Sequence, residues 1–177
     1  DMDADGETTG KQTGVVALVE GSAHPGMASN LALTRVMKGQ ATLLLDADLR
    51  PDVSNGPGEI LGLDHGKSGL YEYLVDGSDI STSDHFDGRL RLLPAGAVGD
   101  NRGLMELGAT GLEDLLSESG GQRFAVVNLP PLEDLEVTLE LAAQLDSAML
   151  VASAGNTRRA DLKAAVARMK RRGIEIS

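Results

Sequence analysis

Three charged side chains at alternate positions follow an apolar run, and their types suit the binding of a metal ion and a phosphate. Leu43-Leu44-Leu45 leads into Asp46, Asp48 and Arg50. In a strand, side chains two residues apart point to one side. The carboxyl ends of buried parallel strands border the crevice in which ligands bind. Two aspartates there suit Mg²⁺ and catalysis, and an arginine suits a phosphate oxygen of a cofactor. An ordinary strand end with solvated charges fits this segment alone equally well.

A second candidate site precedes this one, where an apolar run turns into a helical pattern. The turn reads G-S-A-H-P-G over residues 21–26. Backbone N–H groups and a helix N-terminus can hold an anion in such a turn. A nucleotide loop of this class also needs a Lys and a Ser or Thr just inside the helix, but no lysine lies between Gly26 and Lys38. We expect His24 to be a solvated loop residue. The candidate cofactor-binding residues of this turn are Ser22, Pro25 and Gly26.

Apolar runs of strand length alternate with helical patterns from Val15 onward, which predicts an α/β fold. The expected architecture is a mostly parallel sheet with helices on both faces. The predicted strands are Val15–Gly21, Thr42–Asp48, Leu90–Pro94, Phe124–Leu129 and Ala148–Ser153, with a last strand beginning near Ile174. The predicted helices are Ala28–Lys38, Ser68–Val75, Leu112–Ser119, Leu135–Leu145 and Arg158–Arg172. We expect the Gly-rich segments 51–67 and 95–111 to be loops.

The composition predicts one domain and excludes several classes of site. We expect residues 1–13 to be a disordered acidic lead-in, and residues 14–177 to form a single domain that continues beyond Ser177. The chain of 177 residues has no cysteine, which excludes disulfides, thiolate zinc sites and cysteine nucleophiles. The net charge of −11 disfavours binding to nucleic acid or to anionic lipid. No apolar run approaches the ~20 residues of a membrane span. We interpret the basic segment 158–172 as a solvated helix face.

The order of these segments resembles the bacterial tyrosine kinases of exopolysaccharide and capsule biosynthesis. That family belongs to the deviant P-loop group, which also contains the ParA/MinD ATPases. The resemblance is carried in turn by S-A-H-P-G, N-L-A, D-A-D-L-R, G-L-Y-E-Y-L, L-P-A-G and N-L-P-P, which begin at residues 22, 30, 46, 69, 93 and 128. It implies a P-loop NTPase-like fold, MgATP or ADP as cofactor, and Asp46 and Asp48 as metal ligands. It also implies cofactor contacts from Ser22, Pro25, Gly26, Arg50 and Asn128.

Three departures from the family pattern bear on activity. Only Met27-Ala28-Ser29 separates Gly26 from Asn30, where the family has a longer segment with its Gly-Lys-Ser/Thr core. Asn128 stands where the family has the Asp of D-T-P-P, and a neutral amide holds Mg²⁺ less well. The tyrosine-rich tail is absent; Tyr71 and Tyr73 fit an ordinary amphipathic helix. The preferred hypothesis is therefore a degenerate kinase, or pseudo-kinase, that regulates or scaffolds a polysaccharide system.

Two alternatives stay open, and the resemblance also implies partners. One alternative is an active MgATP-dependent tyrosine autokinase or ATPase whose phosphate loop is missing from this sequence. The other is a ParA/MinD-like positioning ATPase. By resemblance, we expect a membrane polysaccharide co-polymerase, or chain-length regulator, as partner, and assembly into a homo-oligomer. The expected place is the cytoplasm, peripheral to the inner face of the plasma membrane through that partner or a fused segment.

Overall fold

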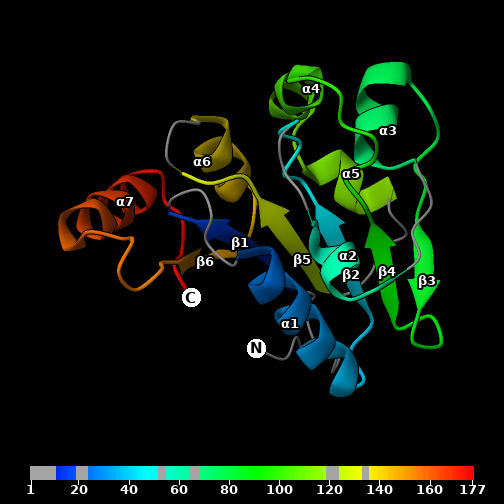
Figure 1. Cartoon of the computed structure of the whole chain (residues 1–177), viewed down its shortest axis with the longest axis horizontal. Helices are drawn as coiled ribbons and strands as arrows, with labels where there is room; N and C mark the ends of the chain where they lie inside the picture. Colours follow the sequence, from blue (N-terminus) through cyan, green and yellow to red (C-terminus); the bar gives the residue numbers. More distant parts are fainter. Residues whose placement is uncertain (1–10, 19–23, 52–54, 64–67, 119–123, 133–135) are drawn as a thin grey trace, which may run out of the picture.

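The computed structural model describes residues 11–18, 24–51, 55–63, 68–118, 124–132 and 136–177. Within these ranges, six strands form one sheet in the order β3-β4-β2-β5-β1-β6 (Figure 1). All neighbouring strands run parallel except the β3–β4 pair at the edge. The strands are β1 (Lys11–Ala17), β2 (Thr42–Asp46), β3 (Ser83–His85), β4 (Leu90–Leu93), β5 (Phe124–Leu129) and β6 (Ser147–Val151).

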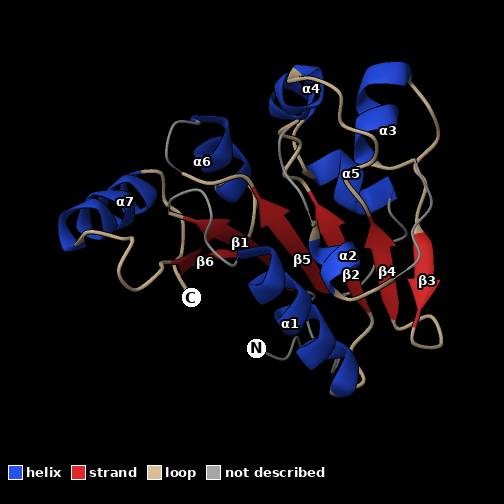
Figure 2. Cartoon of the chain, viewed as in Figure 1, coloured by secondary structure: helices blue, strands red, loops and turns tan. Residues whose placement is uncertain are grey.

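Helices cover both faces of this sheet (Figure 2). One face carries α1 (His24–Met37) and α2 (Pro57–Ile60). The other carries α3 (Leu70–Asp76), α4 (Arg102–Thr110), α5 (Glu113–Glu118), α6 (Glu136–Ala142) and α7 (Arg159–Arg171). None of the helices in the described ranges is long and apolar enough to cross a bilayer. The predicted α/β architecture with a mostly parallel sheet and two helical layers is confirmed.

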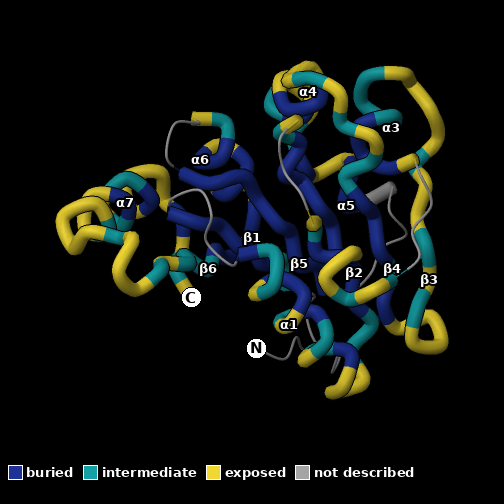
Figure 3. The backbone as a smooth tube through the Cα atoms, in the orientation of Figure 1, coloured by how far each residue is buried: buried dark blue, intermediate teal, exposed yellow. Residues whose placement is uncertain are grey.

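The period-two alternation of the strands divides the core into two apolar clusters. Leu43 and Leu45 of β2 pack beneath α3–α7, whereas Leu44 packs beneath α1. In β5, Val127 belongs to the cluster beneath α3–α7 and Val126 to the cluster beneath α1. Because both faces are covered, the central strands β2 and β5 are buried throughout and are mostly apolar in sequence. Figure 3 shows this buried central layer beneath exposed helix surfaces.

The structure corrects several predicted boundaries. Strand β1 begins at Lys11, so the prediction of disorder is wrong for residues 11–13, while residues 1–10 lie outside the described part. Strand β2 ends at Asp46, two residues earlier than predicted. Near the end of the chain, Ile176 forms an isolated parallel bridge with Ala148 in place of the strand expected from Ile174.

Helix α4 lies in a segment that was predicted to be a loop, and its glycines explain the error. A Cβ atom at Gly103 would stand 2.6 Å from Cδ2 of Tyr71 in α3, and one at Gly108 would stand 2.7 Å from Cγ2 of Val137 in α6. These glycines therefore permit close packing between helices and do not mark a loop. The loop prediction for 51–67 is likewise wrong at α2, where Pro57 occupies the first helical turn.

Strand β3 was also missed, although the sequence carries a signal for it. Asp87-Gly88 is a hairpin dipeptide, and both residues have a positive φ in the turn between β3 and β4. His85 is the last residue of this edge strand. Polar edge strands such as Ser83–His85 give no apolar alternation to detect, so only the turn indicates them.

Candidate functional site

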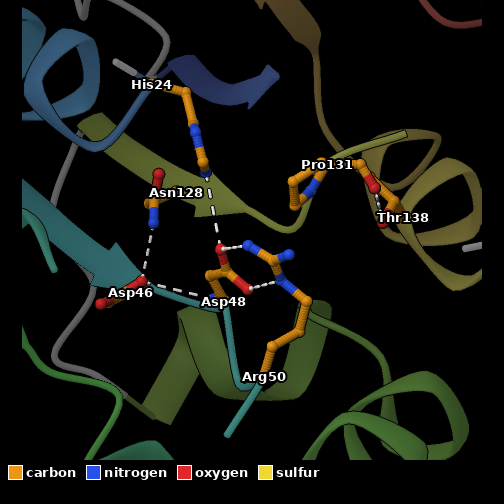
Figure 4. Close-up of polar contacts among 7 residues, drawn as sticks. All are labelled: His24, Asp46, Asp48, Arg50, Asn128, Pro131 and Thr138. Carbon is orange, nitrogen blue, oxygen red and sulfur yellow. Dashed lines mark hydrogen bonds and ion pairs between the residues drawn. The ribbon is translucent and has the colours of Figure 1, made fainter. Parts of the chain in front are cut away.

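The candidate site lies where β2 and β5 end beside the first turn of α1 (Figure 4). Asp46 is the last residue of β2 and pairs in register with Asn128 of β5. The N–H of Ala47 donates to the carbonyl of Asn128 at 2.9 Å, which extends the pairing one residue past the strand. Parallel pairing thus places the Asp46 and Asn128 side chains together at the edge where this class of sheet binds ligands.

Asp46 is a buried carboxylate held by two hydrogen bonds. Nδ2 of Asn128 donates to Asp46 Oδ1 at 2.8 Å, and the backbone N–H of Asp48 donates to the same oxygen at 3.3 Å. Burial raises the pKa of Asp46 to about 7, with a smaller upward contribution from the charge of Asp48, although the Asn128 hydrogen bond opposes the shift. Near neutral pH this carboxyl group therefore exists in both protonation states.

Asp48 and Arg50 lie beyond the strand, so strand alternation does not bring them together as predicted. Their proximity comes from a turn in which the Asp48 N–H reaches back to the Asp46 side chain. Arg50 then donates to both carboxylate oxygens of Asp48, from Nε at 2.7 Å and from Nη2 at 2.9 Å. Burial acts to raise the pKa of Asp48, but hydrogen bonds from Arg50 and His24 outweigh it and hold that pKa below its usual value.

His24 begins α1 and is buried, which corrects its prediction as a solvated loop residue. Its Nε2 lies 3.5 Å from Oδ2 of Asp48. Pro25 and Gly26 are also part of α1, so this helix begins four residues before the predicted start at Ala28, and the cofactor contacts predicted for these two residues stay predictions. The Ser29 hydroxyl lies within hydrogen-bonding distance of the carbonyls of Pro25 and Pro57, which links α1 to α2. Ser22 lies outside the described residues.

A cavity of about 190 Å³ opens beside the two aspartates. It is smaller than the ~300–1,000 Å³ usual for small-molecule sites. Gly56 forms part of the cavity wall. It packs closely against Asp46, since an added Cβ atom at this position would lie 2.3 Å from Oδ2 of Asp46. The N–H of Gly56 donates to the Glu59 carboxylate, which adds a further negative charge near Asp46. The cavity is lined by Asp46, Asp48, Arg50, Pro51, Gly56, Gly58, Glu59, Pro94, Ala95, Gly96 and Val98.

The far wall of this cavity is the L-P-A-G segment after β4, and it is bound to the start of α3. The N–H groups of Leu70 and Tyr71 donate to the carbonyls of Pro94 and Ala95, each at 2.8 Å. Glu72 accepts from the N–H of Gly69 at 2.7 Å and from that of Ala97 at 2.9 Å. Two motifs that are distant in the sequence therefore form one rigid wall. Tyr71 and Tyr73 lie in α3, as predicted.

In the described part of the chain, the donors of this site are engaged with one another. Among the described residues, no three His, Cys, Asp or Glu side chains come together in a group that could hold a metal ion. Both oxygens of Asp48 are engaged by Arg50, and Asn128 presents an amide where Mg²⁺ favours an anionic oxygen. The Oδ1 atom of Asn128 is buried and has no hydrogen-bond partner in the part of the chain that the structure describes. The roles predicted for these residues toward Mg²⁺ and nucleotide therefore remain predictions.

Sequence reasoning missed three contributors to the site: His24, Gly56 and Glu59. The helix was predicted to begin at Ala28, so His24 was assigned to the preceding loop. The structure places it at the start of α1. Glu59 follows Gly56 by three residues, which is the spacing of a helix N-terminal capping pair. Neither position along the chain reveals that both residues face the carboxylates after β2, because that depends on how α1 and α2 pack on the sheet.

No family model and no curated protein sequence matches the chain, but solved structures share its fold. The kinase domain of Escherichia coli tyrosine kinase ETK superposes with a TM-score of 0.78 at 20% identity, over 96% of this chain and 66% of that one. The VpsO kinase domain superposes with a TM-score of 0.79 at 23% identity, over 95% of this chain and 82% of that one. The Pyrococcus furiosus cell division ATPase MinD gives 0.76 at 20% identity, over 95% and 70%. These likenesses confirm the predicted P-loop NTPase-like fold.

Proposed function

We propose that this chain is the kinase-like domain of an exopolysaccharide system and acts as a pseudo-kinase that regulates or scaffolds a membrane co-polymerase. The tyrosine kinase domains among its structural neighbours support the kinase-like part of this proposal. The pseudo-kinase part is supported mainly by one observation, the hydrogen bond of Asn128 to Asp46 at the place where the resembling family has a carboxylate.

The missing lysine adds a quantitative argument. Phosphoryl transfer depends on positioning and on neutralising charge, and one well-placed cationic group can contribute ~10³-fold or more to its rate. The chain has no lysine between Gly26 and Lys38, and the described part of α1 offers His24 at its start. His24 Nε2 lies 3.5 Å from Asp48 Oδ2, so this side chain is directed at the chain's own carboxylate. We expect phosphoryl transfer at this centre to be too slow to serve a function.

The proposed partners follow from the resemblance alone. The domain would bind a membrane polysaccharide co-polymerase, or be fused to one, at the inner face of the plasma membrane. It would assemble there as a homo-oligomer. In this role the fold supplies a surface, and nucleotide turnover is not required.

One alternative has a specific observation in its favour. The septum site-determining protein MinD from Pyrococcus horikoshii, solved in complex with Mg-ADP, shares this fold with a TM-score of 0.70 and 20% identity. An active ATPase of either the kinase or the MinD type needs a Gly-Lys-Ser/Thr segment between Gly26 and Ala28. Sequencing the gene across this junction decides whether such a segment exists.

Isothermal titration calorimetry with MgATP and MgADP tests the proposal directly. We expect no binding by this chain in the micromolar range, with the Pyrococcus horikoshii MinD protein and MgADP as the positive control. Micromolar binding of either nucleotide would contradict the pseudo-kinase assignment. Co-purification with a membrane polysaccharide co-polymerase from the same organism, with and without added MgATP, tests the scaffold role; an association that needs the nucleotide would contradict that role.

A further inference from the structure

The Arg50–Asp48 pair is a buried ion pair with two-point geometry. Arg50 Nε and Nη2 donate to the two carboxylate oxygens of Asp48 at 2.7 and 2.9 Å. The Asp48 side chain is fully buried, and the Arg50 side chain is 20% exposed. Two parallel hydrogen bonds from a guanidinium neutralise a carboxylate and occupy both of its oxygens. A metal ion could bind both oxygens in the same two-point manner only by displacing Arg50.

A second pair in the chain has the same geometry and a different environment. Arg91 donates to the two oxygens of Asp84 at 2.8 and 3.2 Å across the β3–β4 hairpin. Both side chains are more exposed there, at 26% for Arg91 and 50% for Asp84. The hairpin pair is therefore a control in which the bidentate contact is kept while the burial is changed.

One oxygen of Asp46 is likewise engaged from within the chain. Its Oδ1 accepts hydrogen bonds from the Asn128 amide and from the Asp48 backbone N–H. His24 approaches Asp48 from the start of α1, and its Nε2 lies 3.5 Å from Oδ2, the oxygen to which Arg50 Nη2 also donates (Figure 4). The two carboxylates that the sequence suggests as metal ligands thus have protein donors from three separate elements or loops.

We infer that Arg50 is a built-in counter-ion that takes the place of a bound cation, so that this centre closes without metal or nucleotide. The inference rests on the proposed function insofar as it treats the centre as non-catalytic. It adds that the former ligand site contributes to the stability of the domain. Loss of Arg50 removes the two-point contact and leaves the buried Asp48 with the 3.5 Å contact from His24, and breaking a buried ion pair is strongly destabilising.

Thermal unfolding of the whole chain tests this inference with Arg50→Gln and Arg91→Gln compared in EDTA and in MgCl₂. We expect the melting temperature of wild type to be the same in both buffers. Arg50→Gln should lower it by roughly 6–20 °C in EDTA, and Arg91→Gln by less than about 4 °C. Equal effects of the two substitutions, or a rise of the wild-type melting temperature with Mg²⁺, would overturn the inference.

Arg50→Lys keeps the test decisive if Arg50→Gln does not fold. Lysine retains the charge but cannot make the two-point contact, so its melting temperature should fall between those of wild type and Arg50→Gln. A lysine variant that melts below Arg91→Gln supports the inference, and one that melts with wild type contradicts it. The counter-ion inference and the pseudo-kinase proposal can fail independently. If wild type does not bind MgATP in calorimetry but Arg50→Gln melts at the same temperature as Arg91→Gln, the counter-ion inference is disproved and the pseudo-kinase proposal is left intact.

Discussion

Asn128 donates a hydrogen bond to Asp46 across adjacent parallel strands, with 2.8 Å between Nδ2 and Oδ1 and both residues buried. The amide allows a buried carboxylate to exist here without a metal ion. Two carboxylates at this separation would repel each other unless they shared a proton or bound a cation.

The substitution Asn128→Asp should therefore make the stability of the domain depend on cations. At about pH 8 in EDTA, we expect the free energy of unfolding to fall by about 3 kcal/mol or more, because a buried charge is left uncompensated. Added Mg²⁺, or a change to about pH 5, should restore part of it. Urea unfolding measures the loss, with Asn156→Asp in an exposed turn as the control. Full stability of Asn128→Asp in EDTA would show that the amide is dispensable.

The pH dependence of stability should carry a contribution from Asp46. Its pKa in the folded state, about 7, lies above its ordinary value of 3.8. The folded state therefore binds this proton more tightly, and stability falls as the pH rises between these two values, by up to ~1.4 kcal/mol per pH unit. Asp46→Asn, which stays neutral, should gain stability relative to wild type from about pH 5 to about pH 8. Urea unfolding of both proteins across this range measures the difference, and parallel curves would refute the shift.

Gly56→Ala should disturb the cavity wall through a steric clash. The added Cβ would lie 2.3 Å from Asp46 Oδ2, and the short, hydrogen-bonded Asp46 side chain has little freedom to move. We expect a loss of about 1–3 kcal/mol in unfolding free energy. Gly99→Ala is the matched control, because nothing lies within 4 Å of its added Cβ. Equal stability of the two variants would show that Gly56 and Asp46 are not in close contact.

Leu44→Ala tests the smaller core cluster beneath α1. Leu44 is fully buried, so its truncation should cost about 2–5 kcal/mol through lost burial and a residual cavity. Met37, at the end of the same helix layer, is 86% exposed, and Met37→Ala should change stability by less than about 0.5 kcal/mol. Chemical denaturation of both variants checks this contrast. A small loss of stability for Leu44→Ala would contradict the buried, central position of β2 in the sheet.

The sequence was sufficient to predict most of the helices and every strand of the described sheet except β3. β5 was predicted with its observed bounds, since Phe124–Leu129 is apolar except for Asn128 and buried on both faces. α7 was predicted to within one residue at each end, because its apolar residues recur with helical periodicity. The missed elements are those whose residue types are explained by contacts with other elements of the fold. Gly103 in α4, for example, is explained only by the Tyr71 ring against it.

For the candidate site, the sequence by itself determined the ingredients: two aspartates after a buried strand, an arginine two residues later, and an asparagine in place of a carboxylate. Their chemistry was decided only by the tertiary structure. Pairing of β2 with β5 aligns Asp46 and Asn128, and the packing of α1 brings His24 to Asp48. Sequence spacing fixes neighbours along one element, whereas burial and charge partners depend on which elements meet. That is why Arg50 appears in the sequence as a phosphate ligand and lies in the structure as the counter-ion of Asp48.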